Sequence, residues 1–139
     1  MKKKSPMKKI RKEHSTVMIS GKVYALGGYD GEQAKFLNEC EVYDVTKDEW
    51  TIISPMNKAK CAFAATAVND DTIFVCGGYD GENRLRYIEL YDILQDKWTT
   101  LDIFLVTALS NCASCSPKND TVIILGGGCN QGFSHEVYK

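Results

Sequence analysis

The chain has 139 residues, of which 44% are hydrophobic and 25% charged, and its formal net charge is −1. These values are ordinary for one globular domain. Neither a secretory signal peptide nor a membrane span is expected, because no apolar stretch follows the basic N-terminus and no apolar run approaches about 18 residues.

The first 14 residues are basic, with seven Lys or Arg against one Glu, whereas residues 15–139 carry ten Lys or Arg against 17 Asp or Glu. A basic arm can serve nuclear import, nucleic acid or an anionic membrane. The triplet Ser5-Pro6-Met7 recurs as Ser54-Pro55-Met56, however, and Arg11 aligns with Lys60. We therefore interpret residues 5–14 as a junction between repeats, expect no nucleic-acid or membrane partner, and predict a cytoplasmic protein with the nucleus as an alternative.

Short runs rich in β-branched and aromatic residues follow along the chain, separated by turn residues, and none shows helical periodicity. The predicted strands are Ser15–Ile19, Val23–Leu26, Cys40–Tyr43 and Trp50–Ile53, then Ala62–Val68, Thr72–Cys76, Tyr87–Tyr91 and one beginning at Trp98, then Cys112–Ser116, Thr121–Leu125 and His135–Tyr138. The expected fold class is all-β.

These strands belong to a repeat with a period near 50 residues. The hexapeptide Gly-Gly-Tyr-Asp-Gly-Glu occurs at Gly27–Glu32 and again at Gly77–Glu82, and a third diglycine follows. The positions that recur in register are the diglycines, a Tyr and a Trp: Gly27, Gly28, Gly77, Gly78, Gly126, Gly127, Tyr43, Tyr91, Tyr138, Trp50 and Trp98. A period of this length indicates a repeat architecture.

The order diglycine, Tyr, Trp resembles the kelch repeat over residues 5–139. The resemblance implies a partial β-propeller of four-stranded antiparallel blades, with two blades complete and one incomplete. The expected segments are a strand remnant and junction at 1–14 and blades at 15–56, 57–104 and 105–139. We expect the recurring Tyr and Trp to fill the space between blades, and the diglycines to allow close approach or positive φ.

A propeller exposes loops at its rims, and exposed loops often carry binding. We predict that the segments Tyr29–Leu37, Tyr79–Arg86 and Gly128–Ser134, with nearby junctions, bind a protein partner. The candidate partner-binding residues are Arg11, Tyr29, Asp30, Glu32, Lys58, Lys60, Tyr79, Asp80, Glu82, Asn83, Arg84, Asn130 and Gln131.

The resemblance implies a non-catalytic interaction module. In kelch domains that recruit substrates to ubiquitin ligases, the residue after the diglycine and a basic junction position border the partner, which here are Tyr29, Tyr79, Gly128, Arg11 and Lys60. One alternative is an actin-binding scaffold. Another is a kelch-type enzyme, either a copper-radical oxidase or a sugar isomerase, but no catalytic grouping is evident.

No cofactor or metal site is expected. A copper site of that kind would need about two His with Tyr ligands, and His14 and His135 each have a place in the repeat. The pair Cys112 and Cys115 has redox or zinc spacing. Its members should face opposite sides of a strand, and a second matched pair is lacking, so small buried thiols explain the cysteines.

Three blades cannot close a ring, because propellers use about four to eight. Three interpretations remain open: a fragment of a longer kelch protein, a homodimer that completes a six-bladed propeller, or an open solenoid of three blades. In the homodimer, residues 1–7 of each copy would supply the outer strand of the partner's last blade.

Overall fold

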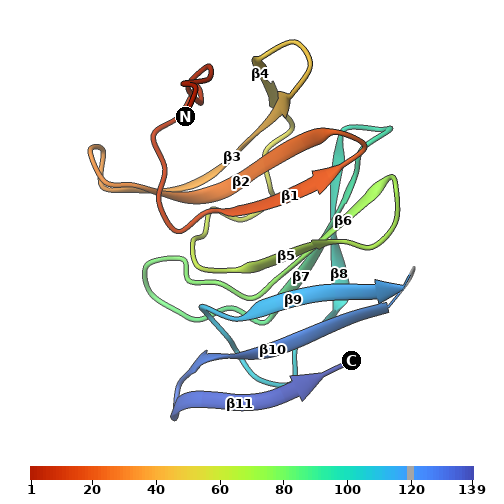
Figure 1. Cartoon of the computed structure of the whole chain (residues 1–139). Helices are drawn as coiled ribbons and strands as arrows, with labels where there is room; N and C mark the ends of the chain where they lie inside the picture. The colour runs from red at the N-terminus through yellow and green to blue at the C-terminus, as the bar shows by residue number, and fades with distance from the viewer. Residues whose placement is uncertain (119–120) are drawn as a thin grey trace.

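The computed structural model describes residues 1–118 and 121–139, and within these residues all regular structure is strand. Three antiparallel sheets follow one another along the chain and lie side by side (Figure 1). The first contains β1 (Ser15–Ile19), β2 (Lys22–Asp30), β3 (Lys35–Asp44) and β4 (Glu49–Ile53), paired in that order.

The second sheet has the same meander, with β5 (Ala64–Ala67), β6 (Thr72–Cys76), β7 (Tyr87–Asp92) and β8 (Lys97–Phe104). The third has β9 (Ala113–Lys118), β10 (Thr121–Cys129) and β11 (Gly132–Tyr138). This arrangement confirms the predicted all-β partial propeller, with two four-stranded blades and one three-stranded blade.

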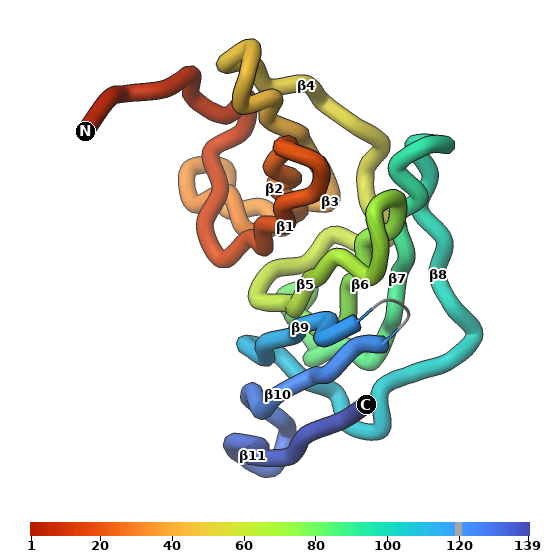
Figure 2. Tube along the Cα trace, turned by 45° about the vertical axis from the view of Figure 1, so that its right-hand side comes forward, coloured from red at the N-terminus to blue at the C-terminus, as the bar shows by residue number. Residues whose placement is uncertain are grey.

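The first strands of the three sheets, β1, β5 and β9, run beside one another in Figures 1 and 2. Backbone hydrogen bonds join the segments that lead into these strands: the Ala62 N–H donates to the Glu13 carbonyl at 2.8 Å, and the Asn111 N–H donates to the Ala62 carbonyl at 2.7 Å. The blades are thus linked by main-chain bonds as well as by side-chain packing.

The hydrophobic core lies between the sheets rather than within any one of them. One cluster fills the space between the first two blades and is made of Val17, Ile19, Tyr24, Leu26, Cys40, Met56, Phe63, Ile73, Val75, Tyr91 and Trp98. A second fills the space between the last two and is made of Ala64, Cys76, Ile88, Leu105, Leu109, Ile124 and Cys129. Each fully buried Leu, Ile or Val stabilises the stack by about 1.5–3 kcal/mol.

The Tyr and Trp of the second repeat fill the space between blades, as predicted. The Tyr91 and Trp98 rings are 4.9 Å apart, both are buried, and the Trp98 Nε1–H donates to the Ser54 carbonyl at 2.8 Å. In the first repeat, Tyr43 and Trp50 stack in the same way but are only half-buried, which corrects the prediction of a core position. The reason is that Trp50 faces the irregular segment around Ser5, whose carbonyl accepts its Nε1–H, instead of a neighbouring sheet.

The diglycines sit where the sequence required them. Gly27 and Gly77 have φ of 52° and 67°, a region that other residues enter at a cost. A Cβ on Gly77 would meet the Leu109 carbonyl oxygen at 2.5 Å, because the junction backbone crosses directly over it. The third pair, Gly126 and Gly127, has the same positive φ values of 57° and 106°.

The observed strand bounds differ from the predicted ones mainly at the strand ends near the diglycines. In the first and third repeats the second and third strands continue past the diglycine, so that the loops predicted at Tyr29–Leu37 and Gly128–Ser134 are mostly strand. Bulges after Leu26 and Leu125 carry the ladder past the glycines. The segment predicted as a strand at Ala62–Val68 is shorter, because Ala62 has φ of 54° and cannot join the ladder.

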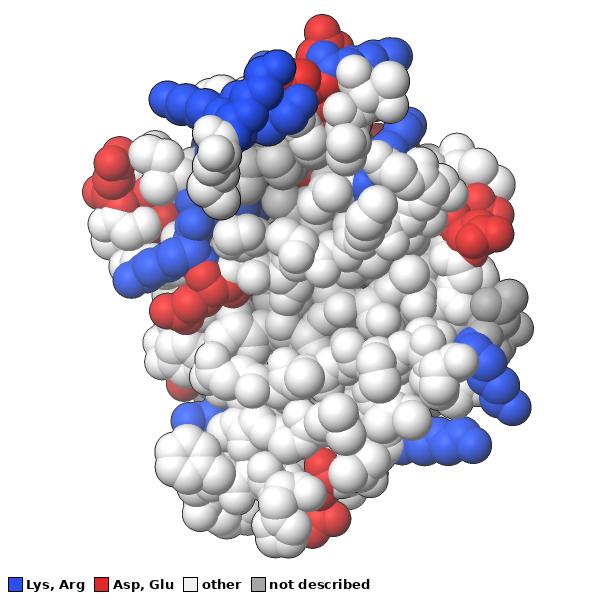
Figure 3. Space-filling model, in the orientation of Figure 1, with Lys and Arg blue, Asp and Glu red and all other residues white. Residues whose placement is uncertain are grey.

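Charge is unevenly distributed over the surface. Figure 3 shows Lys and Arg gathered at the N-terminal end, while the middle of this face, over β1, β5 and β9, is largely uncharged. These strands read Ser-Thr-Val-Met-Ile, Ala-Ala-Thr-Ala and Ala-Ser-Cys-Ser-Pro-Lys. Across the two described stretches, no helix has the length and apolar character needed to cross a bilayer.

Candidate partner-binding rim

One end of the three sheets carries a set of contacts that repeats in every blade. At this end the residue after the diglycine pairs with a junction residue through two backbone hydrogen bonds of 2.6–3.0 Å. The three pairs are Lys12 with Tyr29, Cys61 with Tyr79, and Ser110 with Gly128. We call these six residues and the segments 29–36, 79–86 and 128–134 the rim. Its backbone is held in place by the same bonds in all three repeats.

The residue that follows each paired junction residue is held in the left-handed region. Glu13, Ala62 and Asn111 have φ of 53°, 54° and 54°, although none is glycine. Strain of this kind costs of order 1–3 kcal/mol per residue and is common at functional sites. A hollow of about 370 Å³ opens beside these three residues and is bordered also by Tyr79, Arg84 and Ser110.

An aromatic cluster spans the first two blades on the rim. The Phe36 ring lies between Tyr29 and Tyr79, with centroid distances of 5.0 and 5.9 Å and edge-to-face geometry. The Lys12 ammonium lies 5.3 Å from the Tyr29 centroid. All three rings are partly exposed, and Tyr side chains are enriched at protein interfaces. Sequence reasoning named both Tyr residues but missed Phe36, because the repeat pattern does not extend to that position.

The segment 79–86 is preorganised by its own side chains. The Asp80 Oδ1 accepts the N–H groups of Glu82 at 3.0 Å and Asn83 at 2.8 Å, and the Tyr79 hydroxyl donates to the Gly81 carbonyl at 2.7 Å. Asp30 accepts the N–H groups of Glu32 and Gln33 in the same way. Asp30 is buried in this role, so its side chain holds the turn instead of standing in solvent as the prediction of a partner contact assumed.

Arg11 and Lys60 are the largest correction to the predicted site. Both are buried, the Lys60 side chain completely, and each forms an ion pair with a buried glutamate of the third strand of its sheet. The Arg11 Nη2 lies 2.7 Å from the Glu41 Oε1, and Lys60 pairs with Glu89. These cations therefore hold the junction against its blade and do not reach a partner face. The sequence does contain a signal for this arrangement, because a glutamate stands two residues before the Tyr of the Tyr-Asp pair in both repeats, as Glu41 and Glu89.

Seven of the predicted residues are exposed. Lys58 lies in the junction between β4 and β5, and the other six lie on the rim: Glu32, Glu82, Asn83, Arg84, Asn130 and Gln131. Asn130 and Gln131 form the two-residue connection between β10 and β11. The Arg84 Nε donates to the Ser110 Oγ at 3.1 Å, which ties the second blade to the third at the edge of the hollow.

Cys61 lines the hollow of the rim. The Cys61 thiol donates to the Glu13 Oε2 at 3.2 Å, and burial together with this carboxylate raises the pKa of Cys61 to about 12. The thiol therefore stays protonated and is a poor nucleophile at neutral pH. Burial and the nearby Arg11 charge lower the pKa of His14, which precedes β1 in the first blade.

No group of three or more His, Cys, Asp or Glu in the described parts of the chain is arranged to hold a metal ion. His14 and His135 belong to the first and third blades. Cys112 is half-buried and packs against the second core cluster, whereas Cys115 is exposed, so the two thiols face different surroundings.

The fold and the rim together define a partial β-propeller of repeated blades. The chain belongs to the kelch-repeat family, because the model of the KLHDC2/KLHL20/DRC7 Kelch-repeats domain matches residues 1–139. It is 31% identical over 134 residues to the Kelch-like protein terF of Aspergillus terreus, covering 88% of this chain and 29% of that protein.

Two further relatives lead to the same family. Kelch repeat-containing protein kel-10 of Caenorhabditis elegans is 28% identical, with 92% of this chain and 22% of that protein covered. Kelch-like protein 40 of Mus musculus is 37% identical, with 66% of this chain and 14% of that protein covered. The chain thus spans less than a third of the length of each of these relatives.

Proposed function

We propose that this chain is a non-catalytic protein-interaction module whose rim contacts the partner. The observation that carries the proposal is the paired backbone contact that recurs in all three repeats and fixes the aromatic cluster and the hollow on one surface. A prearranged surface binds with less loss of conformational entropy than a mobile one. Partly exposed Tyr and Phe next to a basic residue are typical of the anchors of protein interfaces.

Affinity purification with quantitative mass spectrometry tests this proposal. The purified chain and the variants Tyr79→Ala and Phe36→Ala are used as baits in lysate of the source cells. The matched control is Leu94→Ala, which removes an exposed apolar side chain from the turn between β7 and β8, at the opposite end of the sheet. We expect both rim variants to lose a set of proteins that the control retains. Identical protein sets for all baits would refute a binding role for the rim.

The narrower proposal is that the partner is a substrate of a ubiquitin ligase. The kelch resemblance supports it, since domains of this kind recruit substrates through the residues after the diglycine, here Tyr29 and Tyr79. The chain expressed alone in cells would then compete for the substrate and slow its degradation in a cycloheximide chase. Tyr79→Ala would not. An unchanged half-life of a partner that binds the rim would reject this narrower role.

The unpaired edge of β11 supports the proposed assembly into a homodimer. In the described residues β11 pairs with β10 alone, whereas the third strands of the other sheets are paired on both sides. An exposed edge is a template for a further strand. Light scattering over a tenfold concentration range would give twice the chain mass of 15.5 kDa for the six-bladed dimer. A constant monomer mass would exclude it.

A further inference from the structure

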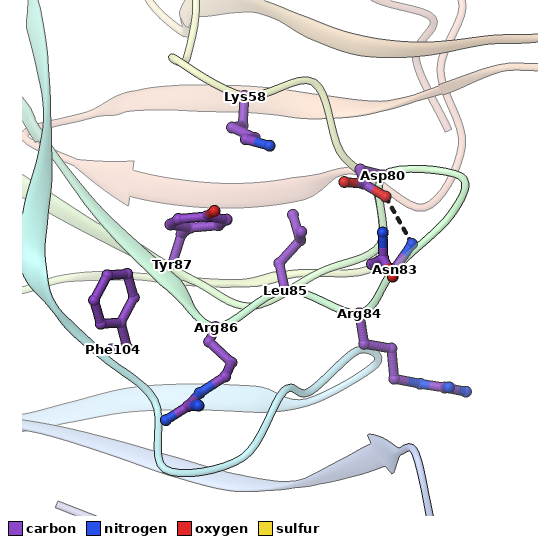
Figure 4. A pocket seen from close by; sticks show the side chains of 8 residues that line it. All are labelled: Lys58, Asp80, Asn83, Arg84, Leu85, Arg86, Tyr87 and Phe104. Atoms are coloured by element: carbon purple, nitrogen blue, oxygen red, sulfur yellow. Dashed lines mark hydrogen bonds between the residues drawn. The ribbon is translucent and has the colours of Figure 1, made fainter.

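The second blade carries a groove at its diglycine end. The groove has a volume of about 530 Å³ and opens between the junction at Lys58, the beginning of β7 and the end of β8. Figure 4 shows the Tyr87 ring between the Lys58 ammonium and the Arg86 guanidinium, with the Phe104 ring to one side of Tyr87. The groove is also lined by the rim segment 79–86, and it shares Arg84 with the hollow of the rim.

Corresponding positions of the two blades are identified by their hydrogen bonds. The Met56 N–H donates to the Asn38 carbonyl at 2.9 Å, and the Leu105 N–H donates to the Arg86 carbonyl at 2.9 Å. Asn38 therefore corresponds to Arg86, and the next residue, Glu39, corresponds to Tyr87. Lys9 and Lys58 correspond as well, since each stands two residues before a buried cation that pairs with the third strand of its sheet.

In the first blade this place already holds a carboxylate. The Glu39 carboxylate lies 3.7 Å from the Lys9 Nζ and 3.0 Å from the Lys35 Nζ. The neighbouring Asn38 carries no charge, and its side-chain amide donates to the Met56 carbonyl at 3.1 Å. The first blade thus satisfies its own lysines with an internal acidic group.

In the second blade the acidic group is replaced by Tyr87 and the amide by Arg86. The Arg86 Nε donates to the Leu105 carbonyl at 2.6 Å, the bond that corresponds to the one made by the Asn38 amide. Among the described residues, the terminal guanidinium nitrogens of Arg86 have no hydrogen-bond acceptor. The Lys58 Nζ lies 5.2 Å from the Tyr87 ring centroid, where its counterpart in the first blade faces a carboxylate. Relative to the first blade, these two replacements add two units of positive charge.

The remaining charges of the groove do not cancel this excess. Asp80 is its one lining carboxylate, its Oδ1 accepts two backbone N–H groups, and its charge interacts with Lys58. The lining therefore carries three cations against one anion. Arg84 also lines the groove, but its Nε is bonded to the Ser110 Oγ on the side of the third blade. Lys58 and Arg86 are exposed, and so is Phe104, whose ring packs against Tyr87 at a centroid distance of 5.8 Å.

We propose that this groove binds an extended acidic segment of a protein partner, with carboxylates beside Lys58 and Arg86 and an apolar side chain against Tyr87 and Phe104. Alternate residues of an extended chain face the same side. The matching pattern is therefore an acidic residue, an apolar residue two positions later and a second acidic residue two positions after that. Charge complementarity sets the choice of partner, and the aromatic pair supplies apolar contact area.

Fluorescence anisotropy tests the proposal with the whole chain and a labelled peptide that contains Glu-Ser-Leu-Ser-Glu. The control peptide has Gln in place of both Glu. Two variants copy the first blade: Tyr87→Glu supplies the internal carboxylate, and Arg86→Asn keeps the structural bond without the charge. Lys58→Glu reverses the third contact, and Lys97→Glu makes the same charge change at the other end of β8.

We expect the Glu peptide to bind and the Gln peptide to bind at least fivefold more weakly. Each of the three groove variants should weaken binding of the Glu peptide by about fivefold, the loss expected when an exposed ion pair is removed or reversed. Lys97→Glu should change it less than twofold. Circular dichroism confirms that each variant keeps the strand signal of the parent chain.

Three results would overturn the proposal: no binding of the Glu peptide at millimolar concentration, equal binding of the two peptides, or equal losses for Lys58→Glu and Lys97→Glu. The groove shares the segment 79–86 with the rim, so this proposal rests on the proposed function of the rim. Tyr79 does not line the groove, so Tyr79→Ala alters the aromatic cluster of the rim and leaves the groove lining intact. Peptide binding that survives Tyr79→Ala but not Tyr87→Glu assigns the peptide to the groove, and the reverse result removes it from there.

Discussion

Replacing Lys60 by Leu tests the buried ion pairs that fix each junction to its blade. Leu109 stands at the corresponding position of the third repeat and is completely buried, so a leucine is compatible with this place in the fold. The substitution leaves the buried Glu89 carboxylate with the Asn57 N–H as its remaining donor, at 2.9 Å. Removing one partner of a buried pair costs about 3–5 kcal/mol. We expect about 3 kcal/mol, since that donor stays and leucine restores most of the packing.

Urea unfolding followed by tryptophan fluorescence measures this loss, because Trp98 lies in the core between the first two blades. The midpoint of thermal unfolding should fall by roughly 10 °C for a chain of this size. The double variant Lys60→Leu with Glu89→Gln should lose less than the sum of the single variants, with a coupling of at least about 1 kcal/mol. Lys97→Leu, at an exposed position of the same blade, should stay within about 0.5 kcal/mol.

A loss below about 1 kcal/mol for Lys60→Leu would refute the reasoning. So would strict additivity in the double variant, since additivity means that the two side chains do not interact. Either result would show that the pair of Lys60 and Glu89 does not fix the junction to its blade.

Two further predictions concern the glycines and the Tyr-Asp contacts. Gly77→Ala should lower the free energy of unfolding by about 2 kcal/mol or more, because the φ of Gly77 is 67° and the new Cβ would meet the Leu109 carbonyl oxygen. Gly31→Ala is the control: a Cβ at Gly31 would have no atom within 4 Å, so this variant should be nearly neutral in the same urea assay. Burial acts to raise the pKa of Asp96, but the Tyr91 hydroxyl at 2.6 Å and the Ser54 N–H lower it overall. A carboxyl with a depressed pKa contributes stability above its unfolded value near 3.8, and that contribution is lost as the pH falls through the lower folded value. Tyr91→Phe should therefore lose less stability than the parent chain between pH 5 and about pH 2, and an unchanged acid profile would contradict the bond.

The presence of the strands and their order along the chain could be predicted from the local residue pattern. Short apolar runs bounded by turn residues predicted the positions of the eleven strands in the described residues. The repeated hexapeptide placed the second and third strands of the first two repeats in the same relation. The ends were less accurate near the diglycines, since a bulge can carry a ladder past a glycine, and residues such as Ala62 adopt positive φ only because neighbouring backbone holds them there.

The candidate site depended more strongly on tertiary structure. Tyr29 and Tyr79 were predicted from the repeat, and the structure places both on the rim beside Phe36. Arg11 and Lys60 were predicted on the same face, but both are buried in ion pairs with glutamates. The sequence pattern did not reveal these pairs, because each glutamate lies about 30 residues from its partner along the chain. A single charged residue in a sequence shows neither the direction of its side chain nor its partner.

The sequence by itself determined the class of fold, because a 50-residue period with diglycine, Tyr and Trp requires a stack of similar sheets whose cores form between neighbours. Only the tertiary structure decided which charges face the solvent. Lys60 and Lys58 are two residues apart in one junction, yet the first is buried against Glu89 and the second stands over Tyr87 at the mouth of the groove. That difference arises from the fold, since burial of a charge is stable only where an opposite charge lies within hydrogen-bond distance.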